Sequence, residues 1–361
     1  MLIRQKLKLL LLLVKKPIFL QKTNSVYNSM LYFVIMFVVN IMNTYNEIKE
    51  RLLDYAYHNN IPMVGEFELT GHCNFSCEMC YAKSNTQDLT TEEWINIFNQ
   101  AQTHGMLYAL LTGGEIFSRP DFVYLYEYLF DLGIKITLYT NGSMLPNSVL
   151  EALTKRPPEL IAITLYGHDE PSYKAFTKSN SFSDVSKNID LLKSKNLNVV
   201  LRTIPLPIIY KELDKIISFA KEKKLHLGHF LYVSKSNPQM KRLNAKQLLD
   251  FELRIKKAFP TKSKTTKAER CGAFKTGFFI NHIGVMQGCA MMPKPSRKID
   301  NNFKEVYDKL QKQWNALVEQ SPCKDCSIKN NCFTCLANRY LEGNMFACSD
   351  YLKDFAKESS I

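Results

Sequence analysis

The sequence predicts an α/β fold in which a parallel sheet is followed by a small cysteine-rich region. Strand and helix patterns alternate between residues 64 and 233, and seven of the ten cysteines lie after residue 270. Successive strand–helix units form a parallel sheet, curved or closed, with its active face at the carboxyl ends of the strands. Hydrophobic residues make up 46% of the chain and charged residues 22%, which is ordinary for a globular protein.

Six short segments have the composition and the apolar pattern expected for the strands of this sheet. Each is separated from the next by a stretch with helical periodicity, so that neighbouring strands are expected to run parallel. The predicted strands are Val64–Thr70, Leu107–Thr112, Ile134–Thr140, Leu160–Tyr166, Leu197–Ile204 and Leu225–Val233.

Capping residues and glycines mark the helices between the strands. Thr90 and the acidic residues after it open the first helix, which stops at Gly105. Asp121 caps the second helix, and Gly133 ends it. Further helices are expected at Asn147–Lys155, Ser183–Lys195, Lys211–Lys224, Ala245–Phe259 and Phe303–Val318.

The chain divides into four parts. In the apolar extension 1–41, neither apolar run alone reaches the ~20 residues that a membrane span needs. We expect either that translation starts at Met42, or at Met30, or that the extension is a peripheral membrane anchor. Residues 42–233 hold the strand–helix units, residues 234–270 read as a polar connector, and residues 271–361 hold the cysteine-rich region.

The formal net charge of +13 raises the question of an anionic partner, either nucleic acid or a membrane surface. The basic residues are mostly lysines spread along amphipathic segments such as Lys211–Lys224, and no aromatic-flanked arginine patch stands out. We therefore attribute the charge to a lysine-rich proteome and expect no nucleic-acid partner.

The ten cysteines fall into two groups separated by a long stretch without cysteine. An even number of cysteines in a secreted protein would indicate disulfides. Clustered spacings of two intervening residues favour metal ligation in a reducing compartment instead. We therefore expect a cytoplasmic protein in which all ten cysteines are metal ligands: Cys73, Cys77, Cys80, Cys271, Cys289, Cys323, Cys326, Cys332, Cys335 and Cys348.

Cys73, Cys77 and Cys80 lie within eight residues, directly after the first predicted strand. Zinc sites and ordinary ferredoxin sites have four protein ligands. Three thiolates on one tight loop would hold three corners of a [4Fe-4S] cluster and leave the fourth iron open to a substrate or cofactor. This loop lies at the carboxyl end of the strand, on the expected active face.

The order of strand, Cys-x3-Cys-x2-Cys, helix, strand and Gly-Gly-Glu over residues ~64–233 resembles the radical S-adenosylmethionine (SAM) enzymes. The resemblance implies a partial (β/α)6 barrel, a [4Fe-4S] cluster on Cys73, Cys77 and Cys80, and SAM chelated to the open iron. It also implies reductive cleavage of SAM to a 5′-deoxyadenosyl radical that abstracts hydrogen from a substrate. The cofactor supplies the chemistry and the protein orients and shields it.

In this family the turn at Gly113-Gly114-Glu115 lies against the amino group of SAM. Glycines let the backbone come close, and carbonyls together with Glu115 can accept hydrogen bonds from an ammonium group. The usual proline after this glutamate is Ile116 here. A plain turn is the alternative for the glycine pair, because such turns often use glycine.

The resemblance adds four further SAM contacts at strand ends. Thr140 and Asn141 end the third strand, although Asn-Gly is also a favoured turn sequence. Thr164 ends the fourth strand at a place where the family often has a serine. Arg202, in the fifth strand, either pairs with the SAM carboxylate or forms a structural salt bridge.

The later cysteines resemble a SPASM domain, the C-terminal extension of radical SAM enzymes that act on peptides and proteins. The resemblance covers residues ~271–348 and implies two auxiliary [4Fe-4S] clusters. Its interleaved pattern implies one group formed by Cys323, Cys326, Cys332 and Cys348, here termed the outer group. The inner group is then Cys271, Cys289 and Cys335.

The inner group lacks a fourth cysteine, because the position that supplies it in some relatives is Gly277. An open iron, a substrate group or a non-cysteine ligand such as His282 would complete the site. The last spacing is one residue shorter than in the family, which bears on the ligand role of Cys335. Two structural zinc sites are the alternative reading of the whole block.

Taken together, these features lead to the hypothesis of an enzyme that modifies or cross-links a ribosomally made peptide. The partners implied are a peptide or protein substrate and a reductant such as flavodoxin or ferredoxin. Residue oxidation in a partner protein, as in anaerobic sulfatase maturation, and small-molecule cofactor assembly are the alternative enzyme readings. A non-catalytic iron–sulfur carrier or a zinc-scaffolded binding module is the alternative outside enzymes.

Overall fold

A computed structural model describes residues 45, 47–80, 82, 84–230, 232–233, 241–260, 271–324, 326–328, 332 and 335–359. The extension 1–41 and much of the connector 234–270 lie outside the described residues. The chain divides into two units between Leu52 and Leu53, and the sheet and all sites below belong to residues 53–361.

The described strands form one nine-stranded sheet in the order β6-β5-β4-β3-β2-β1-β7-β8-β9. Strands β1 to β6 are parallel to their neighbours, β7 is parallel to β1, and β8 and β9 continue antiparallel. The six-stranded parallel part is confirmed, and the sheet is open. The strands are β1 Val64–Glu68, β2 Tyr108–Thr112, β3 Lys135–Thr140, β4 Leu160–Thr164, β5 Val199–Thr203, β6 Leu227–His229, β7 Gly277–Ile280, β8 Val285–Cys289 and β9 Met292–Lys298.

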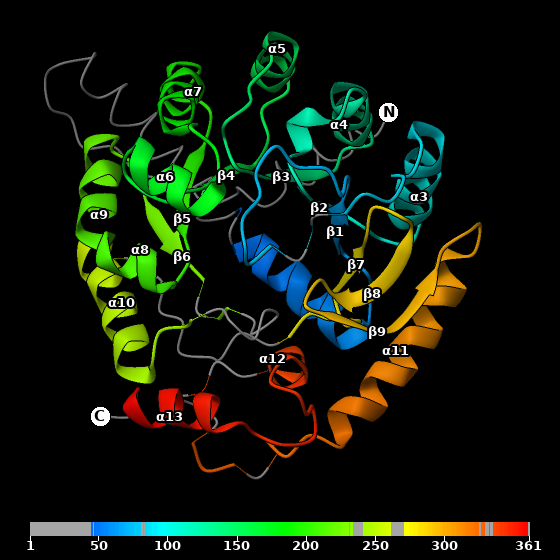
Figure 1. Cartoon of the computed structure of the whole chain (residues 1–361). Coiled ribbons are helices and arrows are strands. Elements are labelled where there is room, and N and C mark those ends of the chain that lie inside the picture. Colours follow the sequence, from blue (N-terminus) through cyan, green and yellow to red (C-terminus); the bar gives the residue numbers. More distant parts are fainter. Residues whose placement is uncertain are drawn as a thin grey trace, which may run out of the picture. The chain divides into compact units, whose positions relative to one another are not determined.

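Figure 1 shows helices along the outer side of the curved sheet in residues 53–361. The predicted helices form with small shifts at their ends, and Lys211–Lys224 corresponds to α9, Leu213–Glu222. The sequence analysis did not predict α6, α8, α12 or α13. The helices are α3 Thr91–Thr103, α4 Phe122–Asp131, α5 Asn147–Lys155, α6 Glu170–Thr177, α7 Phe182–Ser194, α8 Pro207–Lys211, α9 Leu213–Glu222, α10 Ala245–Ala258, α11 Phe303–Glu319, α12 Leu336–Leu341 and α13 Asp350–Glu358.

Strand β1 explains how the sheet acquires two different faces. Phe67 is fully buried, and its ring makes edge-to-face contacts with Trp94 at 6.0 Å and Phe98 at 5.1 Å, both in α3. Because side chains alternate along a strand, Glu66 and Glu68 lie on the opposite face. This face, turned away from α3, is called the inner face below.

Helix starts follow ordinary capping chemistry. The Thr90 hydroxyl accepts from the Glu93 amide, and the Glu93 carboxylate accepts from the Thr90 amide, so α3 begins with a capping box. Asp121 precedes α4 as predicted, but its side chain makes no capping bond. Its carboxylate binds Arg119 and Thr91 instead.

Helices α10, α11 and α13 connect the cysteine-rich region to the rest of the fold. Helix α11 packs on β8 and β9, and α10 packs on β6, α9 and α13. Leu248, Phe251 and Ile255 of α10 are buried, so this part of the predicted connector contributes to the hydrophobic core. Among the described residues, no helix is both long and apolar enough to cross a lipid bilayer.

Candidate active site

The loop that carries Cys73, Cys77 and Cys80 is anchored by Phe75. This side chain is 3% exposed and makes edge-to-face contacts with Tyr166 at 6.1 Å and Tyr173 at 6.5 Å. The next amide, of Ser76, donates to the carbonyl of Thr177 at the end of α6 at 3.0 Å. An aromatic residue between the first two cysteines therefore attaches the loop to the fold.

The three thiols of the loop all lie within electrostatic reach of Tyr166. Cys73 and Cys77 are half-buried and Cys80 is exposed, and the Cys80 amide donates to the Cys77 carbonyl at 3.1 Å. Burial raises the pKa of Tyr166 well above its usual value, and negative charge on Cys77, Cys80 and Cys73 adds to this rise. Burial also raises the pKa of the Cys73 thiol, with smaller contributions from Glu115 and Cys80.

The sulfur of Cys73 has two nearby donors, as a ligand thiolate in an iron–sulfur site commonly does. The Phe75 amide donates to it at 3.4 Å, and the Asn141 side-chain amide lies 3.8 Å away. Among the described residues, no three cysteine, histidine or carboxylate side chains converge as they would on a single metal ion. A cubane cluster holds its thiolates farther apart than one ion does, and three sulfurs on one half-buried loop fit it.

The glycines after β2 let two backbone segments touch. A Cβ at Gly114 would lie 1.8 Å from the His72 carbonyl oxygen, and Gly113 has a φ of +142°. The Gly114 amide donates to Thr70 and the Glu115 amide donates to His72, each at 2.8 Å. The Gly-Gly pair is therefore required for packing this turn against the start of the cysteine loop.

Glu115 is fully buried and joins two turns. Its Oε1 accepts from the Thr140 hydroxyl at 2.7 Å and the Phe117 amide at 3.1 Å, and its Oε2 accepts from the Asn141 amide at 2.8 Å. Burial raises the pKa of Glu115 to about 7, although these hydrogen bonds oppose the rise. In this arrangement Glu115 positions Thr140 and Asn141, and a direct contact with SAM stays a prediction.

Asn141 connects the turn after β3 to the cysteine loop. Its Nδ2 donates to Asn74 Oδ1 at 2.9 Å, and its Oδ1 accepts from the Ser143 amide at 2.8 Å and hydroxyl at 2.6 Å. Asn74 in turn donates to Ser143 Oγ at 2.8 Å. The structure thus brings Gly113–Glu115 and Thr140–Asn141 together beside Cys73, as the strand-end argument predicts.

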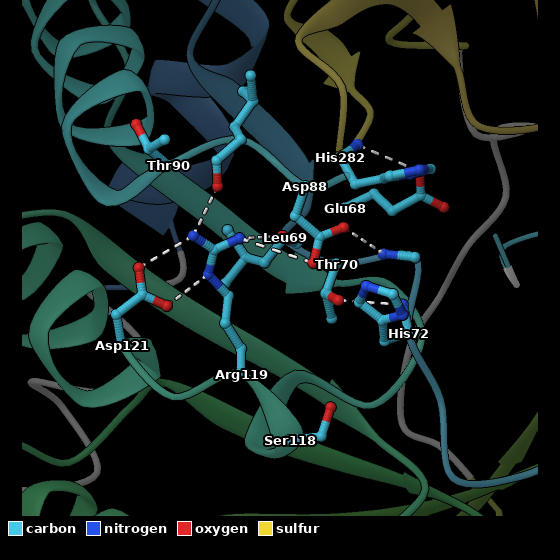
Figure 2. Close-up of polar contacts among 12 residues, drawn as sticks. Glu68, Leu69, Thr70, His72, Asp88, Thr90, Ser118, Arg119, Asp121 and His282 are labelled. Carbon is cyan, nitrogen blue, oxygen red and sulfur yellow. Dashed lines mark hydrogen bonds and ion pairs between the residues drawn. The ribbon is translucent and has the colours of Figure 1, made fainter. Parts of the chain in front are cut away.

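Arg119 is a structural centre that sequence reasoning missed. Figure 2 shows its guanidinium between the end of β1 and the start of α3. It donates to the carbonyls of Leu69 and Leu89, each at 2.8 Å, and to both oxygens of Asp121 at 2.6 and 2.9 Å. Asp88, which accepts from the Gly71 amide at 3.0 Å, lies on the other side of the guanidinium. The arginine following Gly-Gly-Glu by four residues was the available signal.

His282 is already engaged on both ring nitrogens. Nδ1 lies 2.8 Å from the carboxylate of Glu68 and Nε2 lies 2.8 Å from the Thr86 hydroxyl, so it joins β1 to the turn between β7 and β8 (Figure 2). Burial raises the pKa of Glu68, and the hydrogen bond with His282 opposes that rise. This arrangement disfavours His282 as the missing ligand of the inner group.

Arg202 and Thr164 are register neighbours on adjacent strands. The Arg202 guanidinium lies over the rings of Tyr139 at 4.7 Å and Phe230 at 3.9 Å. Among the described residues, no carboxylate lies within ion-pair distance of Arg202, so the alternative of a structural salt bridge does not apply there. A stacked guanidinium keeps its edge available to an anion.

Glu66, on β1, is an ionisable group on the inner face in addition to Glu68. Burial raises the pKa of Glu66 to about 7, Glu68 raises it further, and the charge of Arg202 opposes the rise. Sequence reasoning did not single out Glu66, because one glutamate in an alternating strand usually faces water.

The three inner-group thiols lie near one another. Burial raises the pKa of Cys289 to about 12, and Glu66, Cys335 and Cys271 each add to the rise. Burial also raises the pKa of Cys271, with a contribution from Cys335. Cys289, at the end of β8, is therefore within electrostatic reach of the other two inner-group thiols and of Glu66.

The outer group gathers separately. Burial raises the pKa of Cys348, and the neighbouring Cys323 and Cys326 add to the rise, while Lys353 and Arg339 oppose it. Cys332 is half-buried. The division into two thiol groups and their role as ligands stay predictions.

Comparison with known proteins gives this fold and site a family. The model of the Radical SAM superfamily matches residues 67–220. An S-adenosylmethionine-dependent nucleotide dehydratase of Selenomonas ruminantium is 30% identical over 193 residues, which cover 47% of this chain and 67% of that protein. The chain belongs to the radical SAM superfamily of enzymes.

Two further relatives cover more of the chain. The antilisterial bacteriocin subtilosin biosynthesis protein AlbA of Bacillus subtilis is 25% identical over 315 residues, covering 78% of this chain and 68% of that protein. The crystal structure of Streptococcus suis SuiB bound to its precursor peptide SuiA superposes with a TM-score of 0.65 at 16% identity, covering 97% of this chain and 87% of that chain. The latter likeness supports the fold.

Membership of this family implies a [4Fe-4S] cluster and SAM. Cys73, Cys77 and Cys80 have the spacing and the common loop that fit such a cluster, and the sulfur of Cys73 has two nearby donors. The loop lies beside the turns after β2 and β3, at the carboxyl ends of the parallel strands.

Proposed function

We propose that this enzyme uses a 5′-deoxyadenosyl radical to modify or cross-link a ribosomally made peptide. One observation carries the proposal: β7 pairs in parallel with β1, so a single sheet spans from the three-cysteine loop to the inner thiol group. Glu66 pairs with Phe279, which pairs with Gln287, and Cys289 ends the same strand two residues later, after a shift in register. A substrate on the inner face would meet both groups of thiols.

Within this proposal, Cys73, Cys77 and Cys80 hold the radical-generating cluster. When bound there, a cluster would supply the single electron that reductive cleavage of SAM requires. Asn141 holds the cysteine loop through Asn74, and Glu115 fixes the turn that carries Thr140 and Asn141. Gly113 and Gly114 allow the two backbones to approach.

Thr164 and Arg202 are proposed to receive the carboxylate of SAM. Both lie at the carboxyl ends of neighbouring parallel strands, where ligands of such sheets bind. The guanidinium is held by two aromatic rings rather than by a protein carboxylate. It can therefore pair with an incoming anion without first breaking an internal ion pair.

The seven later cysteines are proposed to hold two auxiliary [4Fe-4S] clusters. The inner group has three thiols, and Gly277 at the start of β7 stands where some relatives supply a fourth. The remaining position is proposed to take a thiolate or another group of the substrate. Two structural zinc sites would leave iron at the first loop alone, which metal analysis distinguishes.

A peptide substrate is favoured by two similar proteins that cover most of the chain. The bacteriocin biosynthesis protein AlbA covers 78% of this chain, and SuiB, which was solved with a precursor peptide, covers 97%. A small-molecule substrate is the second candidate, because an AdoMet-dependent heme synthase of Methanosarcina barkeri, 23% identical, covers 82% of this chain and 95% of that protein. The nucleotide dehydratase covers 47% of this chain.

An electron donor must reduce the first cluster before each radical is formed. A flavodoxin or ferredoxin is proposed for this role, because both carry single electrons at low potential. Such donors and free thiolate ligands are both compatible with the proposed cytoplasmic location. Membrane association through residues 1–41 remains a separate proposal about residues outside the described part.

Anaerobic co-expression with short peptides encoded beside the gene tests the peptide assignment. We expect mass spectrometry to find one peptide that has lost two hydrogen atoms, as a new carbon–sulfur or carbon–carbon bond requires. The Cys77→Ala variant should leave the same peptide unchanged. If SAM is cleaved while every such peptide keeps its mass, the peptide assignment is wrong and the radical chemistry stands.

A further inference from the structure

Arg339 is a buried cation inside the cysteine-rich region. It lies in α12 and is 2% exposed. Among the described residues, no carboxylate lies within ion-pair distance of its guanidinium. Burying a charge without a partner is costly, so the groups that receive its hydrogen bonds are informative.

All three arms of the guanidinium are engaged. Nη1 donates to Cys323 Sγ at 2.9 Å, Nη2 donates to Ser321 Oγ at 2.9 Å, and Nε donates to the Met345 carbonyl at 2.8 Å. A planar guanidinium held at three points has a fixed orientation. The Met345 and Ser321 bonds therefore aim Nη1 at the sulfur.

The charge of Arg339 acts on a second thiol of the outer group besides Cys323. The guanidinium is within electrostatic reach of Cys348, and hence of two of the four thiols that form this group. Helix α12 begins at Cys335, whose sulfur accepts from the Asn338 amide at 3.4 Å. One short helix thus carries an inner-group thiol at its start and, one turn later, the cation that contacts the outer group.

We propose that Arg339 is a positioning residue that raises the reduction potential of the outer auxiliary cluster through its hydrogen bond to Cys323. This inference rests on the proposed function, because it requires that the outer group hold an iron–sulfur cluster. Reduction adds negative charge to such a cluster, and a charge-assisted donor on a ligand sulfur stabilises that charge. Hydrogen bonds and burial around the sulfurs are what set cluster potentials in general.

The test is a potentiometric titration followed by electron paramagnetic resonance, using the full chain with Cys73, Cys77 and Cys80 replaced by alanine. Only auxiliary clusters remain in this background. Arg339→Gln should disfavour reduction of the outer cluster about tenfold, which is about 59 mV more negative for a one-electron couple. An unchanged potential in Arg339→Gln overturns the proposal.

Arg242→Gln is the matched control. Arg242 is also largely buried in this region and binds Glu342 of the same helical segment, but it donates to no sulfur among the described residues. Its replacement should lower stability and leave the potential unchanged. If both variants shift the potential equally, the effect is general loosening and the proposal fails.

If the cluster does not assemble in Arg339→Gln, the same potential is measured in Arg339→Lys. Lysine keeps the charge and loses the three-point fork, so a smaller negative shift is expected, and a potential equal to that of the parent contradicts the proposal. Iron and sulfide analysis of the parent distinguishes a failure of this proposal from a failure of the proposed function. A parent that binds zinc in place of iron at the outer group refutes the auxiliary cluster itself.

Discussion

At the scale of single residues, Glu115 is the side chain on which the candidate site most depends. Its two oxygens receive hydrogen bonds from the turn after β2 and the turn after β3. Glu115→Gln replaces one acceptor by a donor that faces the Asn141 amide. We expect a loss of about 1 to 3 kcal/mol in the free energy of unfolding, because a buried donor is left unpaired.

Chemical denaturation of the parent and of Glu115→Gln, carried out side by side, measures this loss of unfolding free energy. Glu127→Gln is the matched control, since Glu127 forms a partly exposed ion pair with Arg156 and such pairs contribute little. Equal stability of Glu115→Gln and the parent would show that the buried hydrogen bonds of Glu115 are not needed.

Gly114 is the second residue-scale test. In Gly114→Ala the new methyl group would meet the His72 carbonyl oxygen at 1.8 Å, so the cysteine loop must move. We expect loss of the iron held by the first loop, with the auxiliary iron retained. Gly228→Ala, where the nearest atom lies 3.8 Å away, should keep its full iron content. Iron analysis of both variants decides, and full iron in Gly114→Ala would contradict the packing argument.

At the scale of elements, Arg119 ties the end of β1 to the start of α3. Arg119→Leu removes the donor to the carbonyls of Leu69 and Leu89 and the cation that faces Asp121 and Asp88. We expect a loss of about 3 to 5 kcal/mol in stability, as for other broken buried ion pairs. Arg156→Leu removes a more exposed arginine that also has two carboxylate partners and should change the unfolding midpoint little. Similar midpoints for the two variants would refute this role.

A second connection between elements involves Glu342, just after α12. Its carboxylate is 8% exposed, pairs with Arg242 at 2.5 Å and accepts from the Tyr232 hydroxyl at 2.7 Å. Arg242 also lies over the ring of Tyr351 in α13, at 4.0 Å. The Arg242–Glu342 pair therefore joins α12 and α13 to the chain that precedes α10.

This pair predicts a pH dependence. Burial raises the pKa of Glu342, but the bonds from Arg242 and Tyr232 outweigh it and leave the pKa below its usual 4.5. The unfolded chain then binds the proton more tightly, so the stabilisation is complete above pH ~4.5 and lost as the pH falls through the folded pKa. The stability difference between the parent and Glu342→Gln should narrow below that pH. A stability difference between the two proteins that does not depend on pH would contradict this role of the Arg242–Glu342 pair.

Element positions also show how far the sequence determines the fold. Thr90 and Glu93 predict the start of α3 because a capping box is a local interaction. Strands β7 to β9 were not predicted, because their short segments depend on partners far away in the chain. Gly277–Ile280, for example, forms a strand by pairing with β1, more than 200 residues earlier. Helix α6 was missed although Asp169 and Ser172 form a local capping box at its start.

At the scale of the whole molecule, the sequence located the cysteines and turns of the site but not its supporting contacts. Gly113–Glu115 and Thr140–Asn141 could be found because strand ends meet at one edge of a parallel sheet. Glu66 and Arg339 could not, because the role of such an ionisable side chain is recognised only when its surroundings are known, and Arg119 had only its spacing after Gly-Gly-Glu as a signal. The role of Glu115 in joining two turns likewise required the structure.

The continuous sheet is the main result at this scale. It joins the radical-generating loop, the inner face with Glu66 and Arg202, and the inner thiol group within residues 53–361. The proposed peptide chemistry requires that a radical formed at the first loop reach a substrate held near the second group. Radical formation at that loop is therefore the claim on which the rest depends.

The most direct measurement is the yield of 5′-deoxyadenosine from SAM, with the purified, anaerobically reconstituted enzyme and a low-potential reductant. The parent should form 5′-deoxyadenosine, and Cys77→Ala, with one thiolate of the first loop removed, should form none. Absence of 5′-deoxyadenosine from a parent with a full complement of iron, or equal yields from the two proteins, would contradict the account.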